Sequence, residues 1–123
     1  MVSTQRGTDP PPVPREGLMT VKYTFFIGLA DKDSKLQEVG TLEASRIVER
    51  IFCAHGVDGA TITEGRGVYV HDSGEVVTEN TLLVQVFEFG APVNVRAVCE
   101  DLKTVLNQES IAVERRETES ALY

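Results

Sequence analysis

Hydrophobic and polar residues alternate along three stretches of the chain, residues 18–30, 60–70 and 75–89. In the first stretch every second side chain from Val21 to Leu29 is apolar, and most positions between them are not. A period of two is typical of a half-buried β-strand, so we predict a strand in each stretch. The middle stretch contains Gly65 and Gly67. Glycine inside a strand indicates a bulge or a close approach of neighbouring atoms.

Two other stretches repeat their apolar residues at the spacing of an α-helix. In the first we expect Thr41 to be the N-cap and Gly56 to end the helix. The second follows Pro92, a residue that suits the start of a helix. It carries the clearest apolar stripe in the chain, formed by Val95, Val98, Cys99, Leu102, Val105 and Leu106. We therefore predict one helix in each of these stretches.

A short fourth strand is predicted to begin at Ile111 and Val113, before a polar end of the chain at residues 114–123. The element order is then strand, helix, strand, strand, helix, strand. This order is typical of the ferredoxin-like βαββαβ arrangement, in which an antiparallel four-stranded sheet carries both helices on one face. The sequence therefore predicts an α+β fold.

The helix-free face of that sheet carries a set of apolar side chains. With the expected register, the residues that point away from the helices include Phe26, Leu83, Phe87 and Phe89. A contiguous apolar patch of this kind usually marks an interface, whereas scattered surface hydrophobics are normal on a monomer. We expect a homo-oligomer that associates through this face.

The first 17 residues differ in composition from the rest. They contain four of the five prolines, Pro10, Pro11, Pro12 and Pro14, and few large apolar side chains. Such a segment cannot bury enough surface to offset its ordering entropy. We therefore expect residues 1–17 to be a disordered tail and residues 18–123 to form a single domain. Because the charges of the tail cancel, the net charge of −7 belongs to the domain.

An acidic domain lacks the basic surface that binds nucleic acid or anionic membranes. No apolar run approaches the roughly 20 residues that span a bilayer, and the N-terminus has no apolar segment typical of a secretory signal. We expect a cytoplasmic protein with no membrane contact and no direct nucleic-acid binding. Cys53 and Cys99 lack a CxxC spacing and are expected to be reduced thiols, with Cys99 in the core and Cys53 nearer the polar side of its helix.

A short motif follows the first helix and runs through the second strand. Its residues are Val57, Gly59, Thr61, Thr63, Glu64, Gly65 and Gly67. Together with TLLVQVFEF, the second helix and IAVERRE, this motif resembles the PII signal-transduction superfamily, to which the CutA-type proteins are related. The resemblance covers roughly residues 19–117. It implies a compact trimer whose sheets face inward, with ligand clefts between the subunits.

Two loops depart from the pattern of that superfamily. Its nucleotide-binding members carry a long loop between the second and third strands, where this chain has only a short polar stretch around HDSGEVVTEN. Their loop before the last strand is rich in glycine and lysine, whereas residues 106–110 of this chain read LNQES. Because backbone nests and lysine hold phosphate groups, we expect neither ATP nor 2-oxoglutarate binding, and no cofactor.

The candidate ligand-binding residues lie at the end of the second strand and around the loop before the fourth. They are Gly65, Arg66, Gly67, Tyr69, Gln108, Glu109, Ser110 and Arg115, with His71 and Arg116 beside them. In this fold the two regions can approach each other across a subunit boundary. An arginine between two glycines allows an anion to come close and can pair with it in a bidentate manner. The alternative is that Arg66 and Arg115 pair with carboxylates of this acidic protein.

No catalytic or metal site is recognisable in the sequence. His71 and Asp72 alone do not make a metal site, and DKDSK at residues 31–35 lacks the glycine and glutamate of an EF-hand. His55 ends a helical stripe and is expected at the boundary of the core. Because no nucleophile with its base can be assembled from neighbouring residues, we expect no enzymatic activity.

The leading hypothesis is a small oligomeric regulatory or ligand-binding protein without catalytic activity. It would bind a small anionic ligand or a protein partner at clefts between subunits. Two alternatives stay open. One is a small acidic inhibitor or decoy of the type that mobile elements encode, which would block a basic nucleic-acid-binding partner and bind it with a steep salt dependence. The other is a cofactor-free enzyme on a ferredoxin-like fold.

Overall fold

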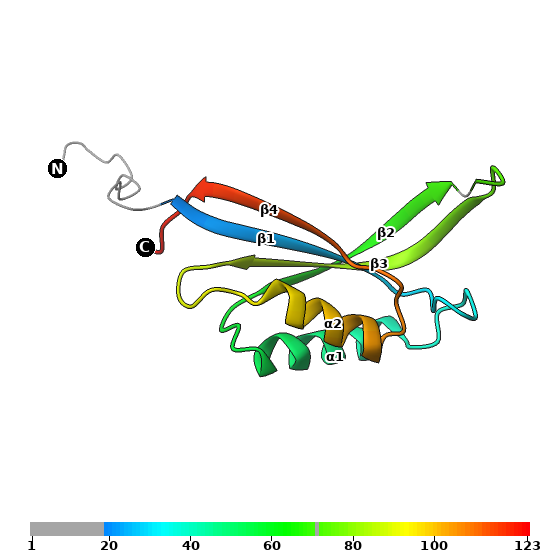
Figure 1. Ribbon diagram of the computed structural model, residues 1–123, viewed down its shortest axis with the longest axis horizontal. Coiled ribbons are helices and arrows are strands. Elements are labelled where there is room, and N and C mark those ends of the chain that lie inside the picture. Colours follow the sequence, from blue (N-terminus) through cyan, green and yellow to red (C-terminus); the bar gives the residue numbers. More distant parts are fainter. Residues whose placement is uncertain (1–18, 71) are drawn as a thin grey trace.

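A computed structural model describes residues 19–70 and 72–123, which form one antiparallel sheet covered by two helices. The elements follow the order β1 (Met19–Gly28), α1 (Thr41–Ala54), β2 (Thr61–Val70), β3 (Val76–Phe87), α2 (Val95–Val105) and β4 (Ala112–Glu119). The strands lie side by side in the order β2-β3-β1-β4, and both helices cover the same face of the sheet (Figure 1). The predicted α+β, βαββαβ fold is confirmed. The expected tail at residues 1–17 lies outside the described residues.

The hydrophobic core fills the space between the sheet and the helices. It is drawn mainly from the two central strands and from the inner sides of the helices, namely Phe25, Ile27, Leu29, Ala44, Val48, Phe52, Leu82, Val84, Val86, Val98, Leu102 and Leu106. The rings of Phe25 and Phe52 meet edge to face, with centroids 5.0 Å apart, a favourable geometry for aromatic pairs. The period of two in β1 and β3 and most of the stripe in α2 therefore select the buried side chains, as predicted, whereas Val105 of that stripe is exposed.

The start of α1 differs from the prediction by one residue. Gly40, with an extended backbone, is the N-cap, and Thr41 is the first residue of the helix. The Thr41 hydroxyl accepts a hydrogen bond from the side chain of Gln37 at 3.0 Å and does not cap the helix. The other end agrees with the prediction, because Gly56 follows the C-cap with a φ of +81°, a conformation that glycine adopts readily.

The start of α2 lies after Pro92 rather than at it. Asn94 is the N-cap, and its side-chain oxygen accepts a hydrogen bond from the backbone N–H of Ala97 at 3.1 Å. Asparagine supplies the oxygen that an unsatisfied N–H at a helix start requires, and proline cannot, since its side chain has no acceptor. Proline is therefore part of the turn that precedes the helix.

β4 is longer than predicted. The charged run that was expected to form a polar chain end continues the strand to Glu119, which pairs with Met19 of β1. β4 lies at the edge of the sheet, and most of its side chains are exposed. Charged side chains are tolerated at an edge because water reaches them, so backbone pairing sets the length of the strand and the apolar pattern does not.

The helix-free face of the sheet carries the predicted apolar side chains. Phe26 is paired with Leu83 on this face. The adjacent pair, Phe25 and Val84, points into the core on the other face. Phe26 is 38% exposed and Phe87 is 41% exposed. Phe87 also stacks on Phe89, with centroids 5.3 Å apart. The expected distribution of side chains between the two faces is confirmed.

β2 and β3 extend beyond the end of β1. The last described pair between β1 and β3 joins Gly28 to Thr81, whereas β3 stays paired with β2 as far as Val76 and Val70. The outer part of the β2–β3 hairpin therefore projects from the sheet as a two-stranded arm (Figure 1). Neither helix in the described part of the chain has the length and apolar character that crossing a membrane requires.

Candidate functional site

The candidate site lies where the sheet narrows from the full set of strands to the two-stranded arm. Continued beyond the pair of Gly28 and Thr81, the register would place Ala30 opposite Glu79. Ala30 has left the strand by this point, and its backbone N–H donates to the side chain of Glu79 instead, with 2.9 Å between the nitrogen and Oε1. A charge-assisted hydrogen bond therefore fixes the Glu79 carboxylate at the end of β1.

Gly28 leaves room for the Glu79 carboxylate, and Gly67 leaves room for the hydroxyl group of Thr81. A Cβ atom at Gly28 would lie 2.8 Å from Cδ of Glu79, and one at Gly67 would lie 2.9 Å from the hydroxyl oxygen of Thr81. Gly67 is also the residue that pairs with Glu79 in β2. An alanine at either position would displace a polar side chain. The sequence predicted a bulge or a close approach here, and the structure has the close approach, since β2 and β3 pair continuously.

Tyr69 lies on the same face of β2 and contacts the same carboxylate. Its pKa is raised above 10.0, first by partial burial and then by the negative charge of Glu79 and a hydrogen bond with that side chain. A carboxylate has about four lone-pair sites, and Ala30 and Tyr69 together occupy about half of them. Glu79 can therefore accept further hydrogen bonds from a ligand donor, and its charge favours a cationic group.

The predicted site residues of β2 fall on opposite faces of that strand. Gly65, Gly67 and Tyr69 lie on the helix-free face with Glu79, whereas Arg66, in register with Asn80, lies on the other face. The Arg66 side chain is exposed, and its guanidinium makes no ion pair or hydrogen bond with the described residues.

Arg115 lies far from Arg66 within one chain. It belongs to β4, at the opposite edge of the sheet from β2, and its guanidinium lies 3.5 Å from the carboxylate of Glu117. The alternative interpretation, pairing with a neighbouring carboxylate, therefore holds for Arg115. A single subunit does not bring the two arginines together, and their approach across a subunit boundary stays a prediction.

Gln108, Glu109 and Ser110 lie in the connection between α2 and β4, which comprises residues 106–111. Glu109 and Ser110 are exposed, whereas Gln108 is only 8% exposed. The Gln108 side-chain amide donates to the backbone oxygen of Ala30 at 2.8 Å and to that of Leu106 at 3.3 Å. Gln108 thus reaches the candidate site through the backbone of Ala30. His71, named beside these residues, lies outside the described part of the chain.

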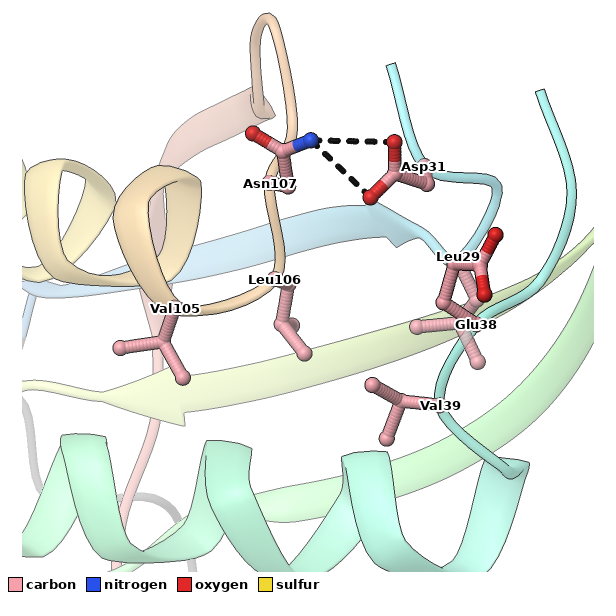
Figure 2. Close-up of a pocket in the computed structure, with 7 residues that line it drawn as sticks. All are labelled: Leu29, Asp31, Glu38, Val39, Val105, Leu106 and Asn107. Carbon is pink, nitrogen blue, oxygen red and sulfur yellow. Dashed lines mark hydrogen bonds between the residues drawn. The ribbon is translucent and has the colours of Figure 1, made fainter. Parts of the chain in front are cut away.

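The same connection also binds the loop that follows β1. Figure 2 shows Asn107 directed at the carboxylate of Asp31, to whose two oxygens its side-chain nitrogen donates at 3.0 and 2.9 Å. These residues border a cavity of about 60 Å³ that Leu29, Val39 and Leu106 also line. About 10–15 Å³ of such space is enough for one water molecule, so this cavity has room for a few water molecules.

Other titratable groups lie away from this site. Nε2 of His55 lies 2.6 Å from Oδ2 of Asp101, which links the end of α1 to α2. Cys53 is exposed, and Cys99 packs partly buried against the core, where burial raises the pKa of its thiol. Within residues 19–70 and 72–123 no three histidine, cysteine or acidic side chains gather in a way that could hold a metal ion.

Glu79 is the residue that the sequence interpretation missed. Its signal is a lone acidic residue within the β-branched run V-V-T-E-N-T. Glutamate is depleted in strands, so its presence in such a run favours a specific contact over a merely solvated position. The sequence pattern could not show that β1 ends at Gly28, so that the N–H of Ala30 bonds the Glu79 side chain instead of a backbone oxygen of β3.

Comparisons with known proteins place the fold. No protein-family model and no curated protein matches the sequence. Among solved structures, a phage SAM lyase in complex with S-methyl-5'-thioadenosine is similar with a TM-score of 0.66 and 24% identity, over 89% of each chain. The apo form of a phage SAM lyase matches with a TM-score of 0.64 and 24% identity, over 87% of each chain.

A PII-family protein shares the same architecture at lower similarity. The structure of GlnK from B. subtilis matches with a TM-score of 0.51 and 16% identity, over 81% of this chain and 85% of that one. At these identities the likeness concerns the fold, which is found both in an enzyme and in a PII protein. The βαββαβ order, the strand order and these structural neighbours together show that the chain has a PII-like fold, as its sequence motif predicted.

Proposed function

We propose that the protein binds S-adenosylmethionine and cleaves it to 5'-methylthioadenosine. The observation that carries this proposal is the Glu79 carboxylate. Ala30 and Tyr69 hold it at the end of β1, where the two-stranded arm begins, and it has lone pairs left for a cationic ligand. The similarity of fold to a phage SAM lyase that binds S-methyl-5'-thioadenosine supports it. The proposal replaces the expected anionic ligand with a cationic one and the expected lack of catalysis with a lyase reaction.

The chemistry follows from the product. Methylthioadenosine keeps the adenosine, the sulfur and the methyl group, so the bond that breaks joins sulfur to Cγ of the amino-acid part. An oxygen of the substrate's own carboxylate attacks Cγ, and the electron pair of the S–Cγ bond moves to sulfur. The products are neutral methylthioadenosine and homoserine lactone, which keeps the positive charge of the ammonium group. No water, proton transfer or cofactor is needed for this balance.

This reaction makes no demand for a nucleophile or a base from the protein. The absence of a recognisable nucleophile–base pair argued against an enzyme at the sequence level, but it does not argue against an intramolecular displacement. The protein has to hold the substrate with its carboxylate behind Cγ, in line with the leaving sulfur. Orientation of this kind accounts for a large part of many enzymatic accelerations.

Glu79 is best suited to the ammonium group of the substrate. The sulfonium loses its charge as the S–Cγ bond breaks, so a carboxylate beside sulfur would stabilise the bound substrate more than the transition state and would slow the reaction. The ammonium keeps its charge throughout. Binding it through Glu79 therefore positions the amino-acid part without opposing the chemistry, while Tyr69 and Ala30 keep the carboxylate in place.

The site is expected to be completed in a homo-oligomer, as a trimer with clefts between the subunits. The supporting observation is that Phe26 and Phe87 are exposed on the same helix-free face to which the Glu79 side chain belongs. A second copy packed on these rings would border the Glu79 carboxylate and exclude water from it. Contacts from Arg66, Arg115 or the 108–110 connection of a neighbouring subunit would then line the cleft.

The test is direct. The purified full-length protein is incubated with S-adenosylmethionine, and methylthioadenosine and homoserine lactone are followed by liquid chromatography and mass spectrometry. In water enriched in oxygen-18, the lactone formed first should carry no label. Glu79→Gln should reduce kcat/KM about 100-fold or more, near the upper limit for a charged hydrogen-bonding partner. Glu75→Gln, at an exposed position near the start of the same strand, is the matched control.

The outcomes separate the hypotheses. Substrate that binds and stays intact would favour the non-catalytic ligand-binding protein expected from the sequence. Formation of labelled homoserine without lactone would indicate hydrolysis by water and would refute the intramolecular reaction. If the protein neither binds nor cleaves S-adenosylmethionine, the proposed function is wrong.

A further inference from the structure

The connection between α2 and β4 makes hydrogen bonds to residues 30–32, which follow β1. The backbone oxygen of Asn107 accepts a hydrogen bond from the N–H of Lys32 at 3.0 Å. The side chain of Asn107 donates to Asp31, and that of Gln108 donates to the oxygen of Ala30 at 2.8 Å. The chain just beyond β1 is therefore held by hydrogen bonds to residues that are 75 to 78 positions away in sequence.

Gln108 is committed to this contact. Its side chain is almost fully buried, and the two donors of its amide nitrogen are used by the oxygens of Ala30 and Leu106. Its own backbone N–H donates to the oxygen of Lys103 at 2.9 Å, which fixes the position of its backbone. Neither side-chain donor is therefore left for a ligand, so the residue acts on its surroundings through Ala30.

Ala30 links Gln108 to Glu79. Its oxygen is held by Gln108, and its N–H donates to the carboxylate of Glu79 at 2.9 Å. These two groups belong to the peptide planes on either side of one Cα. Steric limits on φ and ψ restrict how far one plane can turn while the other is held. On the preceding side, the N–H of Leu29 donates to the oxygen of Asn80 at 3.0 Å, which anchors the last residue still aligned with the sheet.

We propose that Gln108 is a positioning residue for the Glu79 carboxylate, acting through the backbone of Ala30. Without the Gln108 amide, the oxygen of Ala30 loses its buried donor and the segment turns toward water to regain one. The N–H of Ala30 then leaves Glu79, which keeps only its bond with Tyr69. The catalytic consequence of this inference rests on the proposed function, whereas the placement of the carboxylate does not.

The first experiment measures the placement itself. In the isotope-labelled full-length protein, the Ala30 amide proton reports its hydrogen bond with Glu79 through its chemical shift. Glu79→Gln should move this resonance upfield, because a charged acceptor is replaced by a neutral one. Gln108→Leu should move it in the same direction, and Glu79→Gln should then add little to the change. A Gln108→Leu protein that keeps both the wild-type shift and its full response to Glu79→Gln overturns the inference.

The second experiment measures the reaction. Gln108→Leu should lower kcat/KM for S-adenosylmethionine about tenfold, as expected for the loss of one charge-assisted hydrogen bond. The loss should not add to that of Glu79→Gln, since the two residues act as one unit. Additive losses in the double variant would mean that Gln108 acts independently of Glu79, which contradicts the inference.

Controls separate positioning from stability. Leu106→Val, at a buried position of the same connection, should lower Tm without moving the Ala30 resonance, because it leaves the Gln108 amide intact. Glu114→Gln, at an exposed position of β4, should change neither. If Leu106→Val reproduces the effect of Gln108→Leu on the resonance at an equal loss of Tm, Gln108 has only a structural role. A wild-type protein that forms no methylthioadenosine refutes the proposed function, and the amide resonances still decide this inference.

Discussion

Replacing Gly28 with alanine tests whether the Glu79 carboxylate has to occupy its observed position. The added Cβ would lie 2.8 Å from Cδ and 3.0 Å from Oε2 of Glu79, where ordinary contacts lie between 3.4 and 4 Å. Gly28 ends a β-strand and does not have a positive φ, so its backbone accepts alanine. The end of the glutamate side chain must therefore move, and the fold is expected to survive.

The size of the effect follows from the bond that is lost. A hydrogen bond to a charged group contributes about 1.5–3 kcal/mol, and the lower value applies because Glu79 is only partly buried. Replacing glycine by alanine returns about 0.4–1 kcal/mol by restricting the unfolded chain. The net loss of stability is then about 0.5–1 kcal/mol, or a few degrees in Tm. Because each 1.4 kcal/mol is a factor of ten, kcat/KM for S-adenosylmethionine should fall about tenfold or more.

The assay compares methylthioadenosine formation and thermal unfolding in the variant and in Gly59→Ala. A Cβ at Gly59 would meet nothing within 4 Å, so this control adds the same methyl group without a clash. Gly28→Ala should lose activity well beyond what its small change in Tm explains, and Gly59→Ala should lose none. If Gly28→Ala keeps wild-type kcat/KM, the position of the carboxylate does not control the reaction and our reasoning about the site is refuted.

Three further predictions concern ionisation and assembly. Glu79→Gln should let Tyr69 ionise at lower pH, because the charge of Glu79 and the hydrogen bond with it help to raise the pKa of that phenol; a phenolate titration with Tyr69→Phe as reference checks this, and an unchanged curve contradicts it. The pKa of Asp31 is held below 3.8 by hydrogen bonds from the Ser34 backbone, the Asn107 side chain and the Asp33 backbone. The stability that these bonds provide is present above the ordinary aspartate pKa and is lost as the pH falls through the lower folded pKa. Urea unfolding at several acidic pH values should therefore show that the free energy of unfolding falls more steeply with pH in the wild type than in Asp31→Asn. Equal slopes in the two proteins would contradict this. Phe26→Asp should dissociate the proposed oligomer while leaving the helical circular dichroism intact, since this ring is exposed in one chain; light scattering after gel filtration measures the mass, and an unchanged mass would exclude this face as the interface.

The fold could be predicted because its signals are local. The period of two in β1 and β3 and the helical stripe in α2 each select one buried face without reference to distant residues. The errors fall where local preference meets a tertiary constraint. Thr41 does not cap α1 because its hydroxyl is engaged by Gln37, and the charged residues of β4 form a strand because β1 offers them a pairing partner at the edge of the sheet.

The site could be predicted only in part, because it depends on register. The residue types and neighbours of Gly67 and Tyr69 predict them as site residues; the structure places both beside Glu79, and their part in binding a ligand stays a prediction. Glu79 and Ala30 become partners only because β1 ends at Gly28, and no pattern within either segment contains that information. Gln108 was expected to bind a ligand, and that stays a prediction, but the structure shows its amide engaged by two backbone oxygens.

The place of the site on the sheet has a consequence for the proposed reaction. Glu79 and the exposed rings of Phe26 and Phe87 belong to the same helix-free face. A second copy that covers the rings would therefore also lower the access of water to the Glu79 carboxylate. An ion pair strengthens as the effective dielectric constant around it falls, so the attraction between Glu79 and a bound ammonium should be stronger in the proposed oligomer than in a single chain. Phe26→Asp should therefore raise KM for S-adenosylmethionine although its side chain carries none of the chemistry. Gly28→Ala should lower activity without changing the oligomer, so the pair of variants separates assembly from placement of the carboxylate.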